Sequence, residues 1–312
     1  MTTIQETSRA EYVKRINRVT EFIDEHYHEQ VNLDKLAEVA HFSPFHFHRI
    51  FSMITGETPT DFFLRIRTEK AAQQLWDCRN KSISEIAFDC GFSSLALFAR
   101  TFRRHFGMNA SSFRRSEKPV FAKNGIYYSK NGQPMRKNGQ LDAGSNSEIC
   151  FKNLMIMETK IVVKEMPDMQ AVYCRHTGSF NEICKAYDKL FRFAGPRGLI
   201  KADSHTVTVY HDDPSVTEIS KVRQSACLVV EGDVEVEGEI GKMTIKGGKF
   251  AVGHFEIDVT GFEKAWNTMC AWFTESGYEP GEGNPYEYYY CDPENHPEHK
   301  FVLDICIPVK AL

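Results

Sequence analysis

Two arginines occupy the same place in a pattern that the chain repeats. Residues 33–56 read LDKLAEVAHFSPFHFHRIFSMITG, and residues 83–107 read ISEIAFDCGFSSLALFARTFRRHFG. Arg49 and Arg100 each follow a phenylalanine by two residues and precede a glycine by seven. A guanidinium group can donate two parallel hydrogen bonds to guanine or clamp a phosphate. The repeat therefore predicts nucleic-acid chemistry at two equivalent points of the chain.

Each copy predicts a short apolar helix, a tight turn and an amphipathic second helix. This is the pattern of a helix-turn-helix, whose second helix can lie in the major groove of DNA. In the first copy, four residues are expected to face the groove: Phe45, His46, His48 and Arg49. The alternative for Arg49 is a solvated arginine on a helix surface. His46 and His48 lack the helical spacing of metal ligands, so no metal site is expected there.

In the second copy, the second helix begins with apolar residues and continues with basic ones. Leu95 and Ala96 lead it and are expected to contact thymine methyl groups. Arg100, Arg103 and Arg104 supply positive charge that would anchor phosphates. Readout of bases by hydrogen bonds is therefore expected mainly from the first motif.

A different chemistry is predicted near the end of the chain, in the expected strand 285–291. Its alternation places Glu287 and Tyr289 on one face and three other tyrosines on the opposite face. A carboxylate among aromatic rings is costly unless it is paired or used. Three further aromatic residues are candidates for cation–π contact with a ligand there: Tyr173, Tyr210 and Trp266. The alternative is an exposed strand residue with tyrosines that cover a sheet edge.

No catalytic residue, metal site or cofactor is predicted. A lone glutamate is weak support for general acid–base catalysis, and no nucleophile–His–acid arrangement or phosphate loop accompanies it. The segment CDPENHPEHK at 291–300 contains possible metal ligands, but its two prolines and irregular spacing favour a solvated loop.

The elements that must position the arginines are helices with recognisable start signals. Asn32, Ser43, Thr58, Ser82 and Ser93 are expected to precede helices, and 82–85 reads as a capping box. A leading helix is expected over 11–28. A long helix from 58 to about 78 connects the two copies and would span roughly 30 Å, close to the ~34 Å between successive major-groove faces. One chain could therefore read two adjacent groove segments.

The C-terminal part is also duplicated, at offsets of about 80 residues. Each copy predicts strand, helix, strand and strand: 160–175, 180–194, 205–211 and 226–230, then 242–256, 262–276, 286–291 and 300–309. The fold class is thus multidomain, with an all-α double helix-turn-helix domain and an α+β domain of two strand-helix-strand-strand units. The predicted boundaries are 1–115 for the first domain, 116–157 for a linker and 158–312 for the second domain.

Charge is divided unevenly between these parts. Residues 43–115 carry a net charge of +5, and residues 158–312 carry −9. A basic part attracts phosphate, whereas an acidic part attracts cations. The nine cysteines contain no C-x-x-C pair, and no apolar run is long enough to cross a membrane. A cytoplasmic location without membrane contact is the expectation.

The first domain resembles the DNA-binding domain of the AraC/XylS transcription regulators over about residues 10–115. The segment GFSSLALFARTFRRHFGMNASSFRR carries the resemblance through its glycine-phenylalanine turn, its arginine-phenylalanine spacing and its closing glycine. The resemblance implies a regulator that binds double-stranded promoter DNA and engages RNA polymerase. The chain departs from the family pattern at Leu95, Ala96 and Leu97, where family members often have polar residues.

The second domain resembles GyrI-like, or Rob-type, effector-binding domains over about residues 158–312. The segments YHDDPS at 210–215, PGEGNPYEYYYCDP at 280–293 and ICIPV at 305–309 carry this resemblance. It implies that Glu287 attracts a small-molecule effector, typically a lipophilic organic cation. Two alternatives stay open: a small-molecule hydrolase, or a protein-interaction module without ligand sensing.

Overall fold

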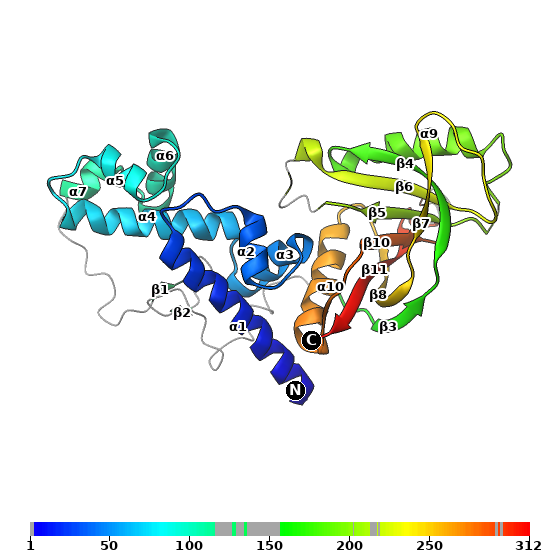
Figure 1. The fold of residues 1–312 in the computed structure, drawn as a ribbon, viewed down its shortest axis with the longest axis horizontal. Helices are drawn as coiled ribbons and strands as arrows, with labels where there is room; N and C mark the ends of the chain where they lie inside the picture. The colour runs from blue at the N-terminus through cyan, green and yellow to red at the C-terminus, as the bar shows by residue number, and fades with distance from the viewer. Residues whose placement is uncertain are drawn as a thin grey trace. The chain divides into compact units, whose positions relative to one another are not determined.

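The computed structural model describes residues 3–115, 127–128, 134–135, 157–201, 203–212, 217, 219–290, 293 and 296–312 (Figure 1). It divides into two compact units, Met1–Arg9 with Leu154–Leu312, and Ala10–Asn153. Most of the predicted linker lies outside the described residues. Within it, β1 (Tyr127–Tyr128) pairs antiparallel with β2 (Pro134–Met135).

The N-terminal part is helical, as predicted. Its helices are α1 (Thr3–His26), α2 (Leu33–Val39), α3 (Pro44–Thr55), α4 (Pro59–Asp77), α5 (Ile83–Asp89), α6 (Leu95–Phe106) and α7 (Ala110–Arg115). The pairs α2–α3 and α5–α6 are the two helix-turn-helix motifs, and α4 connects them (Figure 1). The leading helix α1 begins earlier than the predicted residue 11.

The polar residues predicted to start these helices do so, with one shift. Asn32 Oδ1 accepts a hydrogen bond from the Lys35 backbone N–H at 2.9 Å, and Ser82 forms the expected capping box with Glu85. In the second motif, however, α6 is capped by Ser94 and not by Ser93. Ser94 has an extended backbone, and its Oγ accepts from the Leu97 N–H at 3.2 Å. The turn is therefore one residue longer than predicted.

Aromatic side chains hold the second motif against α4. Phe98 and Phe102 of α6 are 2% and 0% exposed, and they pack in one core with Leu75 and Trp76 of α4. The Trp76 ring stacks on Phe113 of α7, with centroids 4.2 Å apart. Burial of large side chains of this kind contributes about 1.5–3 kcal/mol each. These contacts leave the opposite side of α6 open to solvent.

The C-terminal end of α1 is fixed by residues from α4 and the second motif. Arg67, which is buried in α4, donates hydrogen bonds to the backbone oxygens of Tyr27 and Glu29, both at 2.6 Å. These bonds satisfy carbonyl groups at and just beyond the end of α1, where no helical partner exists. Gly91, in the α5–α6 turn, has φ +79° and lies directly against His28.

Replacing Gly91 with alanine is expected to lower the free energy of unfolding by about 2 kcal/mol, because a left-handed backbone disfavours a Cβ and because the space is filled. An added Cβ would lie 2.6 Å from the His28 carbonyl oxygen. Gly107 is the matched control, since it has φ +71° but no atom within 4 Å of the added Cβ. Gly107→Ala should cost only about 1 kcal/mol. Urea denaturation followed by far-UV circular dichroism distinguishes the two, and equal losses would refute the packing argument.

The C-terminal part is an α+β domain built on a nine-stranded antiparallel sheet. Its strands follow the order β3-β8-β11-β10-β5-β6-β4-β7, and β9 pairs with β11. The strands and helices are β3 (Ile161–Met166), β4 (Met169–Thr177), α9 (Cys184–Ala194), β5 (Thr206–Tyr210), β6 (Arg223–Val229), β7 (Ile240–Ile245), β8 (Gly248–Ile257), α10 (Phe262–Ser276), β9 (Tyr278–Pro280), β10 (Tyr286–Tyr289) and β11 (Phe301–Ala311). Short 3-10 turns lie at Phe180–Glu182 and Ile219–Lys221.

Each of the strands predicted at 160–175 and 242–256 is in fact two strands. The chain bends at Pro167-Asp168 in the first and at Lys246-Gly247 in the second. The two bends meet, because the Gly247 N–H donates to Asp168 Oδ1 at 2.8 Å. Proline has no N–H for a ladder, and an added Cβ on Gly247 would lie 2.2 Å from the Met166 carbonyl oxygen. Each repeat is therefore strand-strand-helix-strand-strand, with β3 paired to β8 and β4 to β7.

Candidate nucleic-acid interface and ligand site

The exposed side of α6 forms a continuous basic stripe. Leu95 is 41% exposed, and Ala96, Arg100, Arg103 and Arg104 are exposed as well. Helical spacing places Ala96, Arg100, Arg103 and Arg104 on the side away from the buried phenylalanines. Leu95 instead shares the spacing of Phe98 and Phe102 and is exposed because it lies in the first turn of the helix. Sequence reasoning missed Ala99, which is also exposed on this stripe. Its small side chain lets the helix backbone approach a surface closely, and the helical period around the predicted residues would have indicated it.

The first motif presents fewer of its predicted residues to solvent. His48 and Arg49 in α3 are partly buried. His46 is 3% exposed, and its Nδ1 lies 2.9 Å from Ser43 Oγ, which precedes the helix. The prediction that His46 faces the groove is therefore wrong, because its ring packs inside the motif. Phe45 belongs to α3, but its side chain lies outside the described residues.

Burial, and then the nearby positive charge of Arg49, lower the pKa of His46 to about 3. Since the pKa in the unfolded chain is near 6.5, stability is fully present above that pH and declines as the pH falls towards 3. Between pH 7 and pH 5, the wild-type chain is expected to lose about 2 kcal/mol more stability than His46→Asn, which cannot titrate. Urea denaturation at both pH values measures this difference. Identical losses in the two proteins would contradict a buried neutral histidine.

In the C-terminal domain, Glu287 is the centre of a hydrogen-bonded group. Its side chain is buried, with 1% of the residue exposed. Oε2 accepts hydrogen bonds from the hydroxyl groups of Tyr210 at 2.6 Å and Tyr289 at 2.5 Å, and Oε1 accepts from Trp266 Nε1 at 2.7 Å. These donors come from β5, β10 and α10, so three elements converge on one carboxylate. All three are neutral groups, and three of the predicted aromatic residues are thereby confirmed as neighbours of Glu287.

Burial, and then the negative charge of Glu287, raise the pKa values of Tyr210 and Tyr289 well above 10. Both phenols therefore stay protonated and remain donors at physiological pH. The Tyr210 ring packs edge-on against Trp266, with centroids 5.4 Å apart, and also lies 5.4 Å from Phe180. The carboxylate is thus surrounded by aromatic surfaces whose faces attract cations.

Glu287 and its tyrosine neighbours lie where the two repeats of the C-terminal domain meet in the sheet. Glu287 in β10 pairs directly with Thr208 in β5, the two central strands of the sheet, and these positions are 79 residues apart. Tyr289 and Tyr210 are separated by the same 79 residues. The two tyrosines are therefore equivalent members of the two repeats, whereas the acid is present in only one of them. Sequence reasoning missed Thr208 and its partner Tyr187, whose hydroxyl lies 2.9 Å from Thr208 Oγ1. The 79-residue offset between the repeats could have indicated Thr208, because it occupies the position equivalent to Glu287.

The structure separates Tyr173 from this group. Tyr173 pairs with Cys227, Cys227 pairs with Val207, and Val207 pairs with Tyr288. Directly paired residues of antiparallel strands share a face. Tyr173 therefore lies on the Tyr288 face of the sheet and not on the face of Glu287. Arg175 covers it there, 5.5 Å from its ring centroid.

The arrangement around Glu287 suits binding of a cation more directly than proton transfer. The phenol and indole donors of Tyr210, Tyr289 and Trp266 stabilise an ionised carboxylate through hydrogen bonds. Among the residues that the structure describes, no group of three or more His, Cys, Asp or Glu side chains could hold a metal ion. Asp292 and Glu294 of the loop considered for metal binding lie outside those residues. No described helix is both long and apolar enough to span a bilayer.

Comparison with known proteins gives two domain matches. Residues 36–116 match a helix-turn-helix domain family, and residues 159–310 match the GyrI-like small molecule binding domain. The chain is 32% identical over 110 residues to the bifunctional transcriptional activator/DNA repair enzyme AdaA of Bacillus subtilis (strain 168), which covers 35% of this chain and 52% of AdaA. It is 38% identical over 92 residues to DNA gyrase inhibitor 2 of Dickeya dadantii (strain 3937), covering 28% and 59% of the two chains.

The chain thus spans about half the length of the curated relatives that it matches. Other similar proteins include the probable transcriptional regulator LumQ of Photobacterium leiognathi, 33% identical over 104 residues, and the XylDLEGF operon transcriptional activator of Pseudomonas putida, 34% identical over 106 residues. A solved EcmrR–DNA complex aligns with 90% of this chain and 100% of its own, at 15% identity and a TM-score of 0.46. The domain matches agree in position with the repeated helix pairs and with the duplicated sheet. The chain therefore combines an AraC-type helix-turn-helix domain with a C-terminal GyrI-like small-molecule-binding domain.

Proposed function

We propose that this chain is a transcription regulator that reads promoter DNA with α3 and α6 and senses a lipophilic organic cation at Glu287. The exposed basic stripe of α6 supports DNA binding. The buried carboxylate with neutral donors supports the choice of a cationic ligand. DNA reading is assigned to residues 1–115 and sensing to residues 158–312, with 116–157 as the linker between them.

Ligand occupancy would change how the protein engages promoter DNA or RNA polymerase. Binding rather than catalysis is proposed at Glu287, since the described contacts of the carboxylate are phenol and indole donors. Because promoter DNA is the partner, the protein would act in the cytoplasm. Phosphate contacts from the arginines would make the affinity for DNA fall steeply with salt.

Genomic footprinting tests this proposal. The expected result is a set of discrete protected sites upstream of genes, each covering two adjacent major-groove segments. The motif is not required to be palindromic, since one chain carries both reading helices. Protection spread evenly over the genome, or none at all, would reject sequence-specific regulation.

A further inference from the structure

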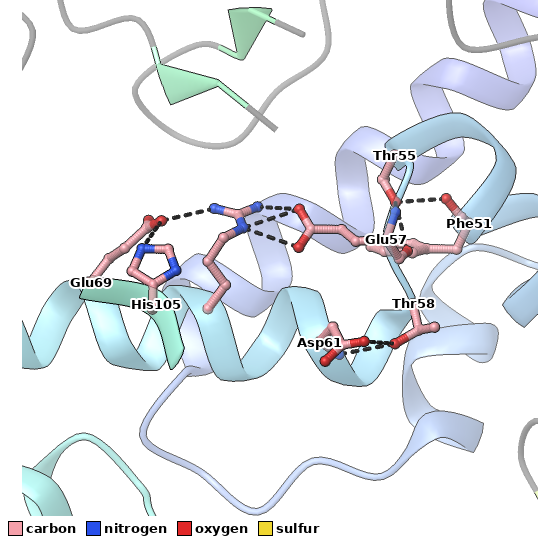
Figure 2. Close-up of polar contacts among 8 residues, drawn as sticks. Phe51, Thr55, Glu57, Thr58, Asp61, Glu69 and His105 are labelled. Carbon is pink, nitrogen blue, oxygen red and sulfur yellow. Dashed lines mark hydrogen bonds and ion pairs between the residues drawn. The ribbon is translucent and has the colours of Figure 1, made fainter. Parts of the chain in front are cut away.

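A chain of polar contacts runs from the end of the first motif along α4 to the second motif. Glu57, between α3 and α4, accepts hydrogen bonds from the Arg65 guanidinium at 2.8 to 3.1 Å, and its side chain is 5% exposed. Arg65 Nη1 also donates to Glu69 Oε1 at 3.2 Å. His105 Nε2 of α6 lies 3.5 Å from the same Glu69 oxygen (Figure 2). The contacts therefore connect both motifs through α4.

A second connection begins at the first turn of α4. Thr58 Oγ1 donates to Asp61 Oδ2 at 3.0 Å and accepts from the Asp61 backbone N–H at 3.1 Å (Figure 2). Arg104 Nη2 donates to the other oxygen, Oδ1, at 3.2 Å. Both connections end on neighbouring residues in the last turn of α6. Two acidic side chains of α4 thus contact the C-terminal end of that helix.

The fully buried part of the apolar contact between the same helices lies further along α4. Phe98 and Phe102, from the middle of α6, pack against the α4 residues Ala72 and Leu75. The polar contacts use Asp61 and Glu69, which precede these fully buried residues of α4, and the partly buried Leu64 and Phe106 continue the apolar contact beside them. An apolar contact alone leaves the crossing angle of two helices adjustable, whereas a second contact some distance away fixes it. The polar contacts therefore add directional restraints on α6 to those of the apolar packing.

We propose that Asp61 and Glu69 are positioning residues that set the orientation of α6 relative to the first motif, and with it the spacing between the two DNA segments that the chain accepts. The inference rests on the proposed DNA-reading function and adds to it a preferred distance between the two contacted DNA segments. Neither acid is a DNA contact in this account, since carboxylates are repelled by phosphate. Arg104, by contrast, is a candidate phosphate contact, and its hydrogen bond to Asp61 also helps to orient α6.

The test uses the full chain and a duplex selected from a random-sequence library by the wild-type protein. Affinity is measured for this duplex and for versions with one or two base pairs inserted between its two contacted segments. The wild type should bind the altered spacings more weakly. Asp61→Ala and Glu69→Ala should each reduce that discrimination roughly 3- to 10-fold, as expected for contacts that couple two elements. Arg104→Ala is not used, because it also removes a candidate phosphate contact.

Charge and positioning predict different results in this experiment. Removing an acid strengthens binding at every spacing by one factor if only charge matters, so the ratio between spacings stays constant. Glu25→Ala, on the exposed surface of α1, is the matched charge control and should leave the ratio unchanged. Asp61 has a 42% exposed side chain, so its replacement should not disturb folding, which circular dichroism verifies.

Unchanged ratios in both α4 variants would overturn the positioning role. If the wild-type protein selects no duplex at all, the proposed function fails instead, and the two failures are thereby distinguished. Retained discrimination in Asp61→Ala together with loss in Glu69→Ala would contradict the role of Asp61 alone.

Discussion

The Glu287→Gln variant is expected to bind tetraphenylphosphonium about 100-fold more weakly than the wild-type chain, a loss of about 2.7 kcal/mol. Glutamine has nearly the same shape, and its amide oxygen can still accept from one tyrosine or from Trp266. What the variant lacks is the negative charge, which is worth most in a site with little water. Trp266 donates directly to Glu287, so its fluorescence should report binding.

Two controls separate a local contact from the general acidity of the domain. Glu282→Gln removes the same charge from an exposed position and should change the affinity less than about twofold. A neutral triaryl compound, triphenylphosphine oxide, should bind the wild type and Glu287→Gln with similar affinity. An equal loss of cation affinity in Glu282→Gln would show that the net charge, and not the buried carboxylate, attracts the ligand.

Arg49→Ala is expected to weaken binding to a selected duplex by about 1–3 kcal/mol, whereas Leu95→Ala should have a smaller effect. A guanidinium that bonds a base edge loses specific contacts on truncation, while a methyl contact is worth less. Both residues lie on reading helices, in α3 and α6. Electrophoretic mobility shifts with the selected duplex and with random DNA, at one salt concentration, measure the difference.

The comparison with random DNA decides what Arg49 touches. If Arg49 reads a base, its removal should reduce affinity for the selected duplex and leave the affinity for random DNA nearly unchanged. Equal losses on both would mean that Arg49 contacts only the phosphate backbone. A larger loss of affinity for the selected duplex in Leu95→Ala than in Arg49→Ala would show that the second motif reads the sequence.

The helices of the first domain could be predicted because their signals are local. Each start depends on one polar residue and on a period of three or four, so Asn32, Thr58 and Ser82 were sufficient. The failure at His46 has a non-local cause, since whether a histidine is buried depends on the packing of the whole motif. The same holds for Asp61 and Arg104, which are 43 residues apart and meet only after α4 and α6 have packed.

In the second domain, alternation within one strand placed Glu287 and Tyr289 on the same face, and the structure confirms it. Alternation does not say which strands are neighbours. Residue type alone therefore groups Tyr173 with Glu287, although the pairing of four strands puts Tyr173 on the opposite face of the sheet. A proline and a glycine at positions 167 and 247 are residue types that favour strand breaks. The sequence does not show, however, that β3 pairs with β8 and β4 with β7, because each of these strands pairs with a strand of the other repeat.

The most direct test of the account measures DNA and ligand in the same experiment. For a selected duplex and a cation that Glu287 binds, the affinity of the protein for DNA is measured with and without saturating ligand, and the affinity for ligand with and without DNA. Thermodynamic linkage requires the two ratios to be equal. A ligand-controlled regulator predicts that both ratios differ from unity by the same factor, about 5- to 150-fold, and that Glu287→Gln abolishes the effect. Two ratios of unity would show that DNA binding and ligand binding are independent, which contradicts the account.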